Sequence, residues 1–226
     1  MTVAVVTGAG RGIGRAVALK LAERGHDVAL LARTVEQLDA VAGEVVARGR
    51  RAVALRCDVS NAGEVANAAE RIAKDLGVPR VVVSNAGVVR RALVVESSEA
   101  DWDHVIDVNL KGAFLVARAL LPAMIAAKRG RFVALASISS TLGTPRQSAY
   151  CAAKWGLIGF VKTLAEELRP SGLQAMCVLP GSVDTSMLHG SGFKPQMSPE
   201  DVANLVTYAA LDAPDALNGS AVEMFG

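Results

Sequence analysis

Val3-Ala4-Val5-Val6-Thr7-Gly8-Ala9-Gly10-Arg11-Gly12-Ile13-Gly14 joins a short apolar run to a glycine-rich loop. A continuous apolar run is typical of a strand that is buried on both faces of a parallel sheet. After the loop, apolar residues recur at helical spacing until Gly25, which predicts a helix. A second apolar run over 28–31 predicts another strand. The chain therefore begins with the strand, loop, helix and strand of a dinucleotide-binding unit.

The rest of the chain repeats this alternation. Further strands are expected at 52–55, 80–83, 131–135, 173–179 and 221–224, and helices at 38–46, 62–76, 99–127, 148–168 and 199–211. Ser60 or Asn61 is expected to cap the helix over 62–76. Strict alternation implies a parallel sheet with helices on both faces. The expected fold is α/β: one domain over residues 1–226 with a doubly wound (Rossmann) seven-stranded parallel sheet.

Composition excludes several classes of protein. The net charge of the 226 residues is +2, which leaves no electrostatic footprint for nucleic acid. Cys57, Cys151 and Cys177 are widely spaced and odd in number, which fits neither a disulfide framework nor a zinc site, and we expect no metal. The first residues resemble a strand rather than a signal peptide, and we find no uncharged apolar stretch of about 20 residues. We therefore expect a cytoplasmic protein that binds no membrane.

The glycine loop predicts where a cofactor binds. Gly8, Gly12 and Gly14 are spaced as G-x-x-x-G-x-G between a strand and a helix. Glycines let the chain turn tightly and bring backbone N–H groups against a pyrophosphate at the helix N-terminus. We therefore expect the loop to hold a dinucleotide.

The end of the second strand indicates which dinucleotide. A carboxylate there would bind the ribose hydroxyls and repel a 2′-phosphate. Here the strand ends Leu31-Ala32-Arg33, without an acid. Arg33 and Arg11 are both placed to reach this corner, and guanidinium groups are suited to phosphate. The sequence therefore predicts NADP(H) rather than NAD(H).

Tyr150 and Lys154 are candidates for acid–base chemistry. They are four residues apart in a predicted helix, so their side chains point the same way. A phenol has an ordinary pKa of about 10, and a neighbouring cation lowers it. We therefore expect Lys154 to lower the pKa of Tyr150.

Taken together, these motifs resemble those of the short-chain dehydrogenase/reductase family, over nearly the full length of the chain. The matching residues are Thr7 to Gly14, Asp58, Asn85-Ala86-Gly87, Asn109, Ser137, Tyr150 to Lys154, and Pro180-Gly181 with Thr185. Ser84 stands where the family usually has another Asn. Within the family, the chain looks most like the NADPH-dependent 3-oxoacyl carrier-protein reductases and their carbonyl-reductase relatives.

The resemblance implies four catalytic residues. Tyr150 would be the general acid in the reductive direction, and Lys154 would lower its pKa and hold the nicotinamide ribose. Ser137, thirteen residues before Tyr150, would hydrogen-bond the substrate carbonyl, whereas the serines at 139–140 would be loop residues. Asn109 would hold a water that connects Lys154 to solvent.

The resemblance also implies the residues that bind the cofactor. Asp58 and Val59 would lie against the adenine, 85–87 would line the adenosine side, and 180–185 would hold the carboxamide end. The expected set is Gly8, Gly10, Arg11, Gly12, Ile13, Gly14, Arg33, Asp58, Val59, Asn85, Ala86, Gly87, Tyr150, Lys154, Pro180, Gly181, Val183 and Thr185.

The expected partners follow from the same resemblance. The stretch 186–198 is expected to be a short lid over a small-molecule or carrier-borne carbonyl substrate. Arg90, Arg91, Lys128 and Arg129 form basic pairs that we expect to be solvated at the ends of elements; the alternative is that they attract an acidic carrier protein. A homotetramer or homodimer is expected through the long helices at about 101–128 and 148–169. Small residues on those helices would permit close packing: Ala113, Ala117, Ala152, Ala153, Gly156 and Gly159.

The function expected first is NADPH-dependent reduction of a ketone or 3-oxoacyl thioester to the alcohol by hydride transfer. An alternative is an NAD(P)-dependent alcohol or hydroxysteroid-type dehydrogenase of the same family. A distant alternative is a nucleotide-binding regulator without catalysis. The sequence does not identify the substrate.

Overall fold

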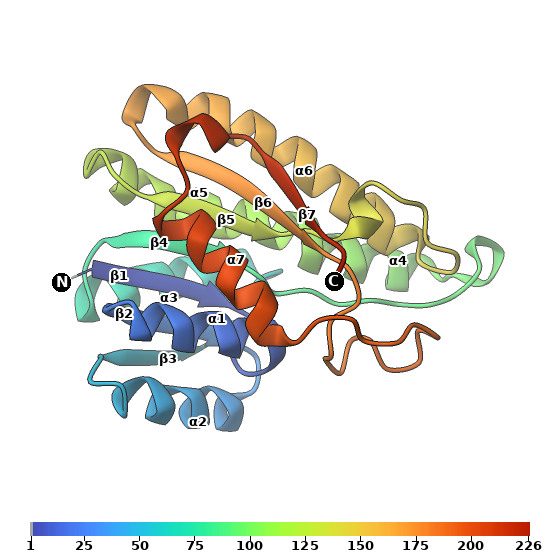
Figure 1. Cartoon of the computed structure of the whole chain (residues 1–226), viewed down its shortest axis with the longest axis horizontal. Helices are drawn as coiled ribbons and strands as arrows, with labels where there is room; N and C mark the ends of the chain where they lie inside the picture. The colour runs from blue at the N-terminus through green and yellow to red at the C-terminus, as the bar shows by residue number, and fades with distance from the viewer. Residues whose placement is uncertain (1) are drawn as a thin grey trace.

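All seven strands lie in one parallel sheet. The computed structural model describes residues 2–226, and its strands have the order β3-β2-β1-β4-β5-β6-β7 (Figure 1). The strands are β1 (Thr2–Thr7), β2 (His26–Ala32), β3 (Ala52–Arg56), β4 (Pro79–Ser84), β5 (Arg131–Leu135), β6 (Gln174–Pro180) and β7 (Ala221–Met224). Every neighbouring pair is parallel. The α/β, doubly wound prediction is confirmed.

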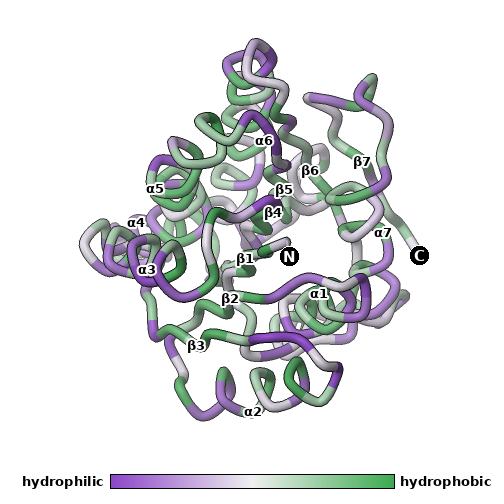
Figure 2. Tube along the Cα trace, turned by 90° about the vertical axis from the view of Figure 1, so that its left-hand side faces the viewer, coloured by the Kyte–Doolittle hydropathy of each residue, from purple (hydrophilic) through white to green (hydrophobic). Residues whose placement is uncertain are grey.

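Helices cover both faces of the sheet. They are α1 (Gly12–Glu23), α2 (Val35–Val46), α3 (Ala62–Asp75), α4 (Glu99–Ile106), α5 (Gly112–Ala126), α6 (Ser148–Leu168) and α7 (Pro199–Leu211). Shorter turns are η1 (Val94–Glu96), η2 (Asp107–Lys111), η3 (Ile138–Ser140), η4 (Arg169–Ser171) and η5 (Asp215–Leu217). Figure 2 shows α1, α2 and α7 on one face and α3 to α6 on the other. Asn61 caps α3, because its side-chain oxygen accepts from the backbone N–H of Gly63 and Glu64.

Alternate residues of the central strands contribute to two separate cores. Val5 of β1 and Phe132 of β5 pack into the apolar cluster under α3, α5 and α6. Val6 and Val133, their chain neighbours, pack into the cluster under α1, α2 and α7. The central strands are therefore apolar on both faces, which is why they appear in the sequence as continuous apolar runs.

The helix expected over 99–127 is interrupted. Between α4 and α5, the five residues of η2 form a π-helical turn. Asn109 lies in this turn, and its side-chain Nδ2 donates to the carbonyl of Val105, four residues earlier, at 2.8 Å. A side chain that bonds within the backbone ladder bends or widens a helix. Such π turns often mark functional sites.

The run Glu99–Ala126 is long and apolar enough, by length and composition alone, to cross a membrane. However, 56% of its most apolar window is buried inside the fold. Val116, Leu120 and Met124 pack there against the sheet. A buried core helix of a globular protein meets the same criterion, and we assign this run to the core.

The parallel arrangement gathers the loops that follow the strands at one edge of the sheet. The strand order changes direction between β1 and β4, where the chain leaves the β3 side and continues toward β7. In open α/β sheets, ligands bind at such a switch point, beyond the carboxyl ends of the strands. The fold therefore predicts a ligand site at the loops that follow β1, β4, β5 and β6.

Candidate active site

The loop between β1 and α1 requires glycine at three positions. Gly8 and Gly12 have φ of +63° and +52°, in the left-handed region. A β-carbon on Gly14 would lie 2.1 Å from the carbonyl oxygen of Gly8, which no side chain tolerates. Helix α1 then begins without an acidic residue in its first turn and without a capping bond from the Arg11 side chain. Its N-terminal N–H groups are therefore available to an anion.

Asn85 and Thr7 join this loop to the end of β4. The Thr7 hydroxyl accepts from the backbone N–H of Asn85 and of Ala86, both at 2.9 Å. Asn85 Nδ2 donates to the carbonyl of Thr7 at 2.9 Å and to that of Gly8 at 3.3 Å. The stretch 85–87, expected to bind the adenosine side, is therefore fixed against the glycine loop.

Thr185 approaches the same loop from the other side. A β-carbon on Gly12 would lie 3.2 Å from Thr185 Cγ2. Gly181 precedes it and is held against the last strand, because its N–H donates to the carbonyl of Met224 at 2.8 Å. Val183 is buried and forms a bridge with Met197. The structure therefore brings together the three segments expected to hold a dinucleotide, and these segments fit such a ligand.

Arg11 and Arg33 lie exposed near the ends of β1 and β2. Within residues 2–226, neither forms an ion pair. Asp58 lies close to Arg33: burial raises the pKa of Asp58, but hydrogen bonds from Ser60 and the charge of Arg33 lower it overall. The Val59 side chain is only 6% exposed and packs against Gly112, so it belongs to the core.

The four residues expected to be catalytic are all buried. Tyr150 and Lys154 lie in the first two turns of α6, Ser137 begins η3 after β5, and Asn109 lies in η2. Their exposed fractions are 9% for Tyr150, 4% for Lys154, 9% for Ser137 and 2% for Asn109. Lys154 Nζ lies 5.6 Å from the centre of the Tyr150 ring.

The expected lowering of the Tyr150 pKa is wrong. Burial raises the pKa of Tyr150, and this effect outweighs the lowering by Ser137 and by the charge of Arg91. Lys154 is not among the groups that lower the pKa of Tyr150, and its Nζ donates to the carbonyl of Leu135 at 2.6 Å. Burial also lowers the pKa of Lys154 itself to about 8. The phenol of Tyr150 is therefore held in its protonated form at neutral pH.

Ser137 differs from the two serines that follow it in its hydrogen bonds. Ser139 Oγ pairs with Thr144 Oγ1 at 3.0 Å, and Ser140 Oγ accepts from the N–H of Ser137 at 3.2 Å. Ser137 Oγ accepts from the N–H of Ser139 at 3.2 Å, which leaves its own proton to donate. Its influence on the Tyr150 pKa places it beside the phenol.

In the side-chain amide of Asn109, the nitrogen has hydrogen-bond partners and the oxygen has none in the described chain. Its Nδ2 donates to the carbonyls of Val88 and Val105, both at 2.8 Å. Its Oδ1 is buried and has no partner within residues 2–226. A buried acceptor without a donor costs about 1–3 kcal/mol, so such groups normally find one. The Asn109 oxygen is thus suited to accept from a water or a ligand.

A cavity of about 410 Å³ opens near these residues. Its lining comes from the segments after β4, before α6 and after β6. The residues are Arg91, Thr144, Pro145, Arg146, Gln147, Gly190, Ser191 and Phe193. The sequence did not indicate 144–147 as part of a site, since these positions match no motif. A volume of this size is typical of a small-molecule site.

The stretch 186–198 crosses the carboxyl edge of the sheet near Arg91. Arg91 Nη2 donates to the carbonyl of Met187 at 2.7 Å, and Nη1 donates to that of His189 at 3.4 Å. At its base, the N–H of Asp184 donates to the carbonyl of Met197 at 2.9 Å. The described residues 2–226 contain no group of three or more His, Cys, Asp or Glu arranged to hold a metal ion.

Comparison with known proteins identifies relatives across the chain. Residues 2–194 match the family model described as short chain dehydrogenase. The chain is 38% identical over 220 residues to a 3-oxoacyl-[acyl-carrier-protein] reductase from Synechocystis, covering 93% of this chain and 89% of that protein. It is also 38% identical over 244 residues to a (3R)-3-hydroxyacyl-CoA dehydrogenase from Canis lupus familiaris, covering 99% and 94%.

A solved structure gives the same picture. The chain superposes on a metagenomic short-chain oxidoreductase in complex with NADP, with a TM-score of 0.87 and 39% identity. The match covers 99% of this chain and 96% of the other. The likeness therefore extends over nearly the full length of both chains.

Proposed function

Because this chain belongs to the short-chain dehydrogenase family, we propose that it is an NADPH-dependent reductase of a ketone or 3-oxoacyl thioester. The observation that carries the proposal is a buried, protonated Tyr150 with Ser137 and Lys154 beside it. A phenol that keeps its proton at neutral pH can donate it to an oxygen on which negative charge develops.

Each residue of the site has its own proposed role in the reduction of the carbonyl. When bound, the nicotinamide cofactor supplies the hydride. Ser137 and Tyr150 donate hydrogen bonds to the substrate carbonyl oxygen, and Tyr150 gives up its proton as the alcohol forms. Lys154 holds the nicotinamide ribose and returns a proton to Tyr150 from solvent. Asn109 Oδ1 accepts from a water on that route, which would satisfy its buried oxygen.

The protonation state of Tyr150 in the free protein favours the reductive assignment. Oxidation of an alcohol needs Tyr150 as a base, and burial opposes loss of its proton at neutral pH. Reduction needs the phenol as an acid, in the form that burial favours. We therefore place the oxidative dehydrogenase second.

The choice of NADPH rests on Arg11 and Arg33. Both are exposed beside the end of β2, without an ion pair in the described chain, so their charges are available to a 2′-phosphate. The similar metagenomic oxidoreductase has NADP bound, as the description of its structure states. The uncapped N-terminus of α1 would take the pyrophosphate.

A turnover screen tests the proposal. Acetoacetyl thioesters, diketones and quinones are offered with NADPH and, separately, with NADH. We expect at least one carbonyl class to be reduced, with kcat/KM for NADPH at least about tenfold above that for NADH. Preference for NADH would overturn the cofactor assignment. Tight NADPH binding without any turnover would favour the non-catalytic regulator.

A pair of variants isolates the contribution of Arg33. Arg33→Ser should lower the NADPH/NADH ratio by about tenfold, since one charged hydrogen-bonding group is lost. Arg71→Ser is the matched control, because Arg71 is also exposed but pairs with Asp75 on α3. An unchanged ratio in Arg33→Ser would remove Arg33 from the cofactor site.

We further propose a cytoplasmic enzyme with one catalytic domain, whose segment 186–198 acts as a lid and which assembles as a homodimer or homotetramer. The expected packing of small residues needs a correction. Ala113, Ala117 and Ala153 are buried within the chain, so they cannot contact another subunit. Exposed apolar residues on these helices, such as Phe114 and Trp155, take their place in the proposed subunit contact.

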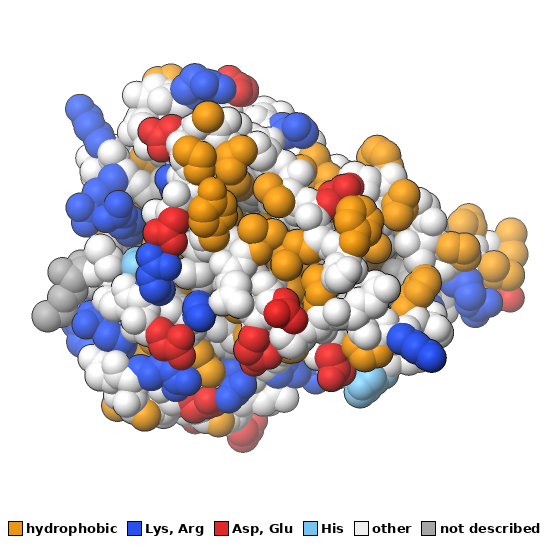
Figure 3. All heavy atoms as spheres, in the orientation of Figure 1, with side chains coloured by type: hydrophobic (Ala, Val, Ile, Leu, Met, Phe, Trp, Pro, Cys, Tyr) orange, Lys and Arg blue, Asp and Glu red, His pale blue; other side chains and the backbone are white. Residues whose placement is uncertain are grey.

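A second exposed apolar surface is seen elsewhere on the molecule. Apolar side chains gather over α7 and β7 in Figure 3.

A further inference from the structure

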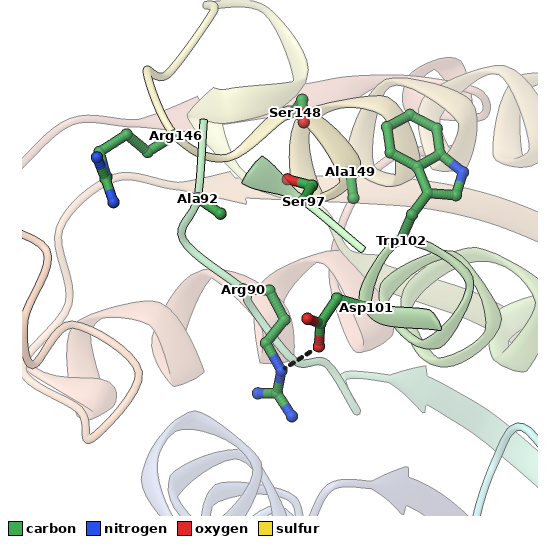
Figure 4. Close-up of a pocket in the computed structure, with 8 residues that line it drawn as sticks. All are labelled: Arg90, Ala92, Ser97, Asp101, Trp102, Arg146, Ser148 and Ala149. Carbon is green, nitrogen blue, oxygen red and sulfur yellow. Dashed lines mark hydrogen bonds and ion pairs between the residues drawn. The ribbon is translucent and has the colours of Figure 1, made fainter. Parts of the chain in front are cut away.

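Three arginines lie near the mouth of the candidate site, and one of them is neutralised. Arg90 Nε donates to Asp101 Oδ1 at 3.1 Å, a pair that Figure 4 shows. The small cleft that these two residues line has a volume of about 10 Å³. That is about the space of one water, too little for a ligand. Arg90 therefore offers no free charge to a substrate.

Arg91, the next residue, has no such partner. Within residues 2–226, no carboxylate lies within 4.0 Å of its guanidinium. Its Nη atoms donate to the backbone carbonyls of Met187 and His189. Its Nε is buried without an acceptor. A partly buried cation with an N–H that has no acceptor lowers the stability of the fold unless an anion binds to it.

Arg146 presents a second charge to the same cavity. Its φ of +64° is unusual for a residue other than glycine, and such strain gathers at functional sites. The N–H of Ala92 donates to its carbonyl at 3.0 Å, which joins the two arginine-bearing segments. Its nearest carboxylate, Glu96, is 4.0 Å away and exposed, so the pair is weak. In Figure 4, the Arg146 side chain points away from the Arg90–Asp101 pair.

The cavity of about 410 Å³ that Arg91 and Arg146 line contains no Asp or Glu in its wall. Phe193 adds an apolar surface from the opposite segment. Gln147, three residues before Tyr150, also lines the cavity, so the space adjoins the start of α6. In addition, the charge of Arg91 acts on the Tyr150 phenol, although burial has the larger effect on that pKa. The cavity therefore adjoins the start of the helix that carries Tyr150, and its wall carries net positive charge.

We propose that the substrate carries an anionic group, a carboxylate or a phosphate, and that Arg91 and Arg146 bind it in the cavity next to the start of α6. This inference rests on the proposed reductase function and specifies its substrate class. Guanidinium groups bind carboxylates and phosphates through paired hydrogen bonds. Both would act as specificity-determining residues, and neither takes part in proton transfer.

Two matched substrate pairs test the inference at saturating NADPH. The first pair is 3-oxohexanoate and its methyl ester, which differ in a carboxylate. The second pair is 3-oxohexanoyl coenzyme A and 3-oxohexanoyl N-acetylcysteamine, which differ in a phosphate-bearing arm. We expect kcat/KM of the wild type to favour the charged member by at least about tenfold in one pair. A preference within the first pair would identify the anion as a carboxylate, and a preference within the second pair would identify it as a phosphate.

Variants then assign the preference to the two arginines. Arg91→Gln and Arg146→Asn should each lower the charged-to-neutral ratio by at least about fivefold. Asn tolerates the left-handed conformation at position 146, so that variant removes the charge with little backbone cost. Arg91→Lys should keep part of the preference, because the charge remains. Arg90→Gln is the control and should leave the ratio unchanged, because Arg90 is paired with Asp101.

The outcomes separate this inference from the proposed function. A ratio near one in both pairs, or an equal change in Arg91→Gln and Arg90→Gln, overturns the inference alone. An unchanged ratio together with weaker NADPH binding in Arg91→Gln also overturns it, since the charge would then serve the cofactor. If the protein reduces a neutral diketone but none of the four substrates, the inference about an anionic substrate is overturned, and the proposed reductase function is not. Failure to reduce any carbonyl overturns both proposals.

Discussion

Asp27, at the start of β2, and Lys154, beside the end of β5, are two buried charges with opposite surroundings. Asp27 is 1% exposed and accepts from Arg50 Nη2 at 2.9 Å, Arg51 N at 3.0 Å and Arg51 Nε at 2.9 Å. Lys154 is 4% exposed and donates to the carbonyl of Leu135, with no carboxylate within 4.0 Å among the described residues. The Asp27 carboxylate is therefore paired with two guanidinium groups, whereas the Lys154 ammonium has only a neutral carbonyl as its partner.

The pKa values of the two groups express this difference. Burial raises the pKa of Asp27, but the hydrogen bonds of Arg51 and the charge of Arg50 lower it overall, so the folded state favours the charged form. Burial lowers the pKa of Lys154 to about 8, so the folded state disfavours its charge. The amino edge of the sheet therefore holds a charge that stabilises the fold. The carboxyl edge holds one at a cost to stability, which is expected where function requires it.

The largest expected effect comes from Lys154→Met. Turnover should fall by at least about a thousandfold, because Lys154 no longer holds the cofactor ribose or supplies protons. At pH 7 the free energy of unfolding should nevertheless rise, by about 1–2 kcal/mol, since a disfavoured buried charge is removed and only the bond to Leu135 is lost. Urea unfolding and steady-state kinetics measure both quantities.

The pH dependence of this stabilisation has a definite sign. Lys154 is charged in both folded and unfolded states below about pH 8, where the folded state carries the full penalty. The penalty disappears as pH rises from about 8 toward the ordinary value of 10.5. The advantage of Lys154→Met should shrink over that range. A variant that is less stable than the wild type at pH 7 would contradict the comparison.

Asp27→Ala should have the next largest effect, and of opposite sign. Removing the buried carboxylate deletes its charged hydrogen bonds, but the side chains of Arg50 and Arg51 are 24% and 53% exposed and remain solvated, so the cost should be about 1.5–3 kcal/mol. The loss should be full above the ordinary pKa of 3.8 and should shrink as pH falls below it, until Asp27 of the folded wild type is protonated at its own lowered pKa. Turnover per folded molecule should not change, and a selective loss of turnover would place Asp27 in the site.

The smallest effect is the response of the wild-type rate to pH. We expect kcat/KM for reduction to be level up to about pH 8 and to fall above it, as Lys154 loses its charge. The phenol of Tyr150 should remain protonated there, because its pKa is raised above its ordinary value. A rate that rises through pH 8 would indicate that Tyr150 acts as a base.

The sequence was most informative where one residue type serves one purpose. Continuous apolar runs predicted the central strands, because a strand buried on both faces has few polar positions, whereas the edge strands β3 and β7 are only partly buried. The glycine loop was predictable because Gly8 and Gly12 adopt positive φ and Gly14 leaves no room for a side chain, so each position requires glycine. The family motifs likewise named Ser137, Tyr150 and Lys154, which the fold brings together.

Properties that depend on tertiary contacts could not be predicted. The raised pKa of Tyr150 follows from burial, which a four-residue spacing does not reveal. The π turn at η2 depends on a bond from Asn109 to a carbonyl in its own helix. Arg146 enters the cavity through a left-handed backbone conformation that its residue type disfavours. Ala113, Ala117 and Ala153 pack inside the chain whereas Ala152 and Gly159 are exposed, and the spacing of these small residues alone does not indicate which surface each one faces.

The central claim is that Tyr150 donates the proton in carbonyl reduction, and Tyr150→Phe tests it most directly. The measurement is kcat with saturating NADPH on a substrate found in the carbonyl screen, with NADPH affinity determined on the same sample by fluorescence titration. We predict a loss of at least about a thousandfold in kcat and an affinity within about threefold of the wild type, because only the hydroxyl is removed. A kcat within tenfold of the wild type would contradict the account.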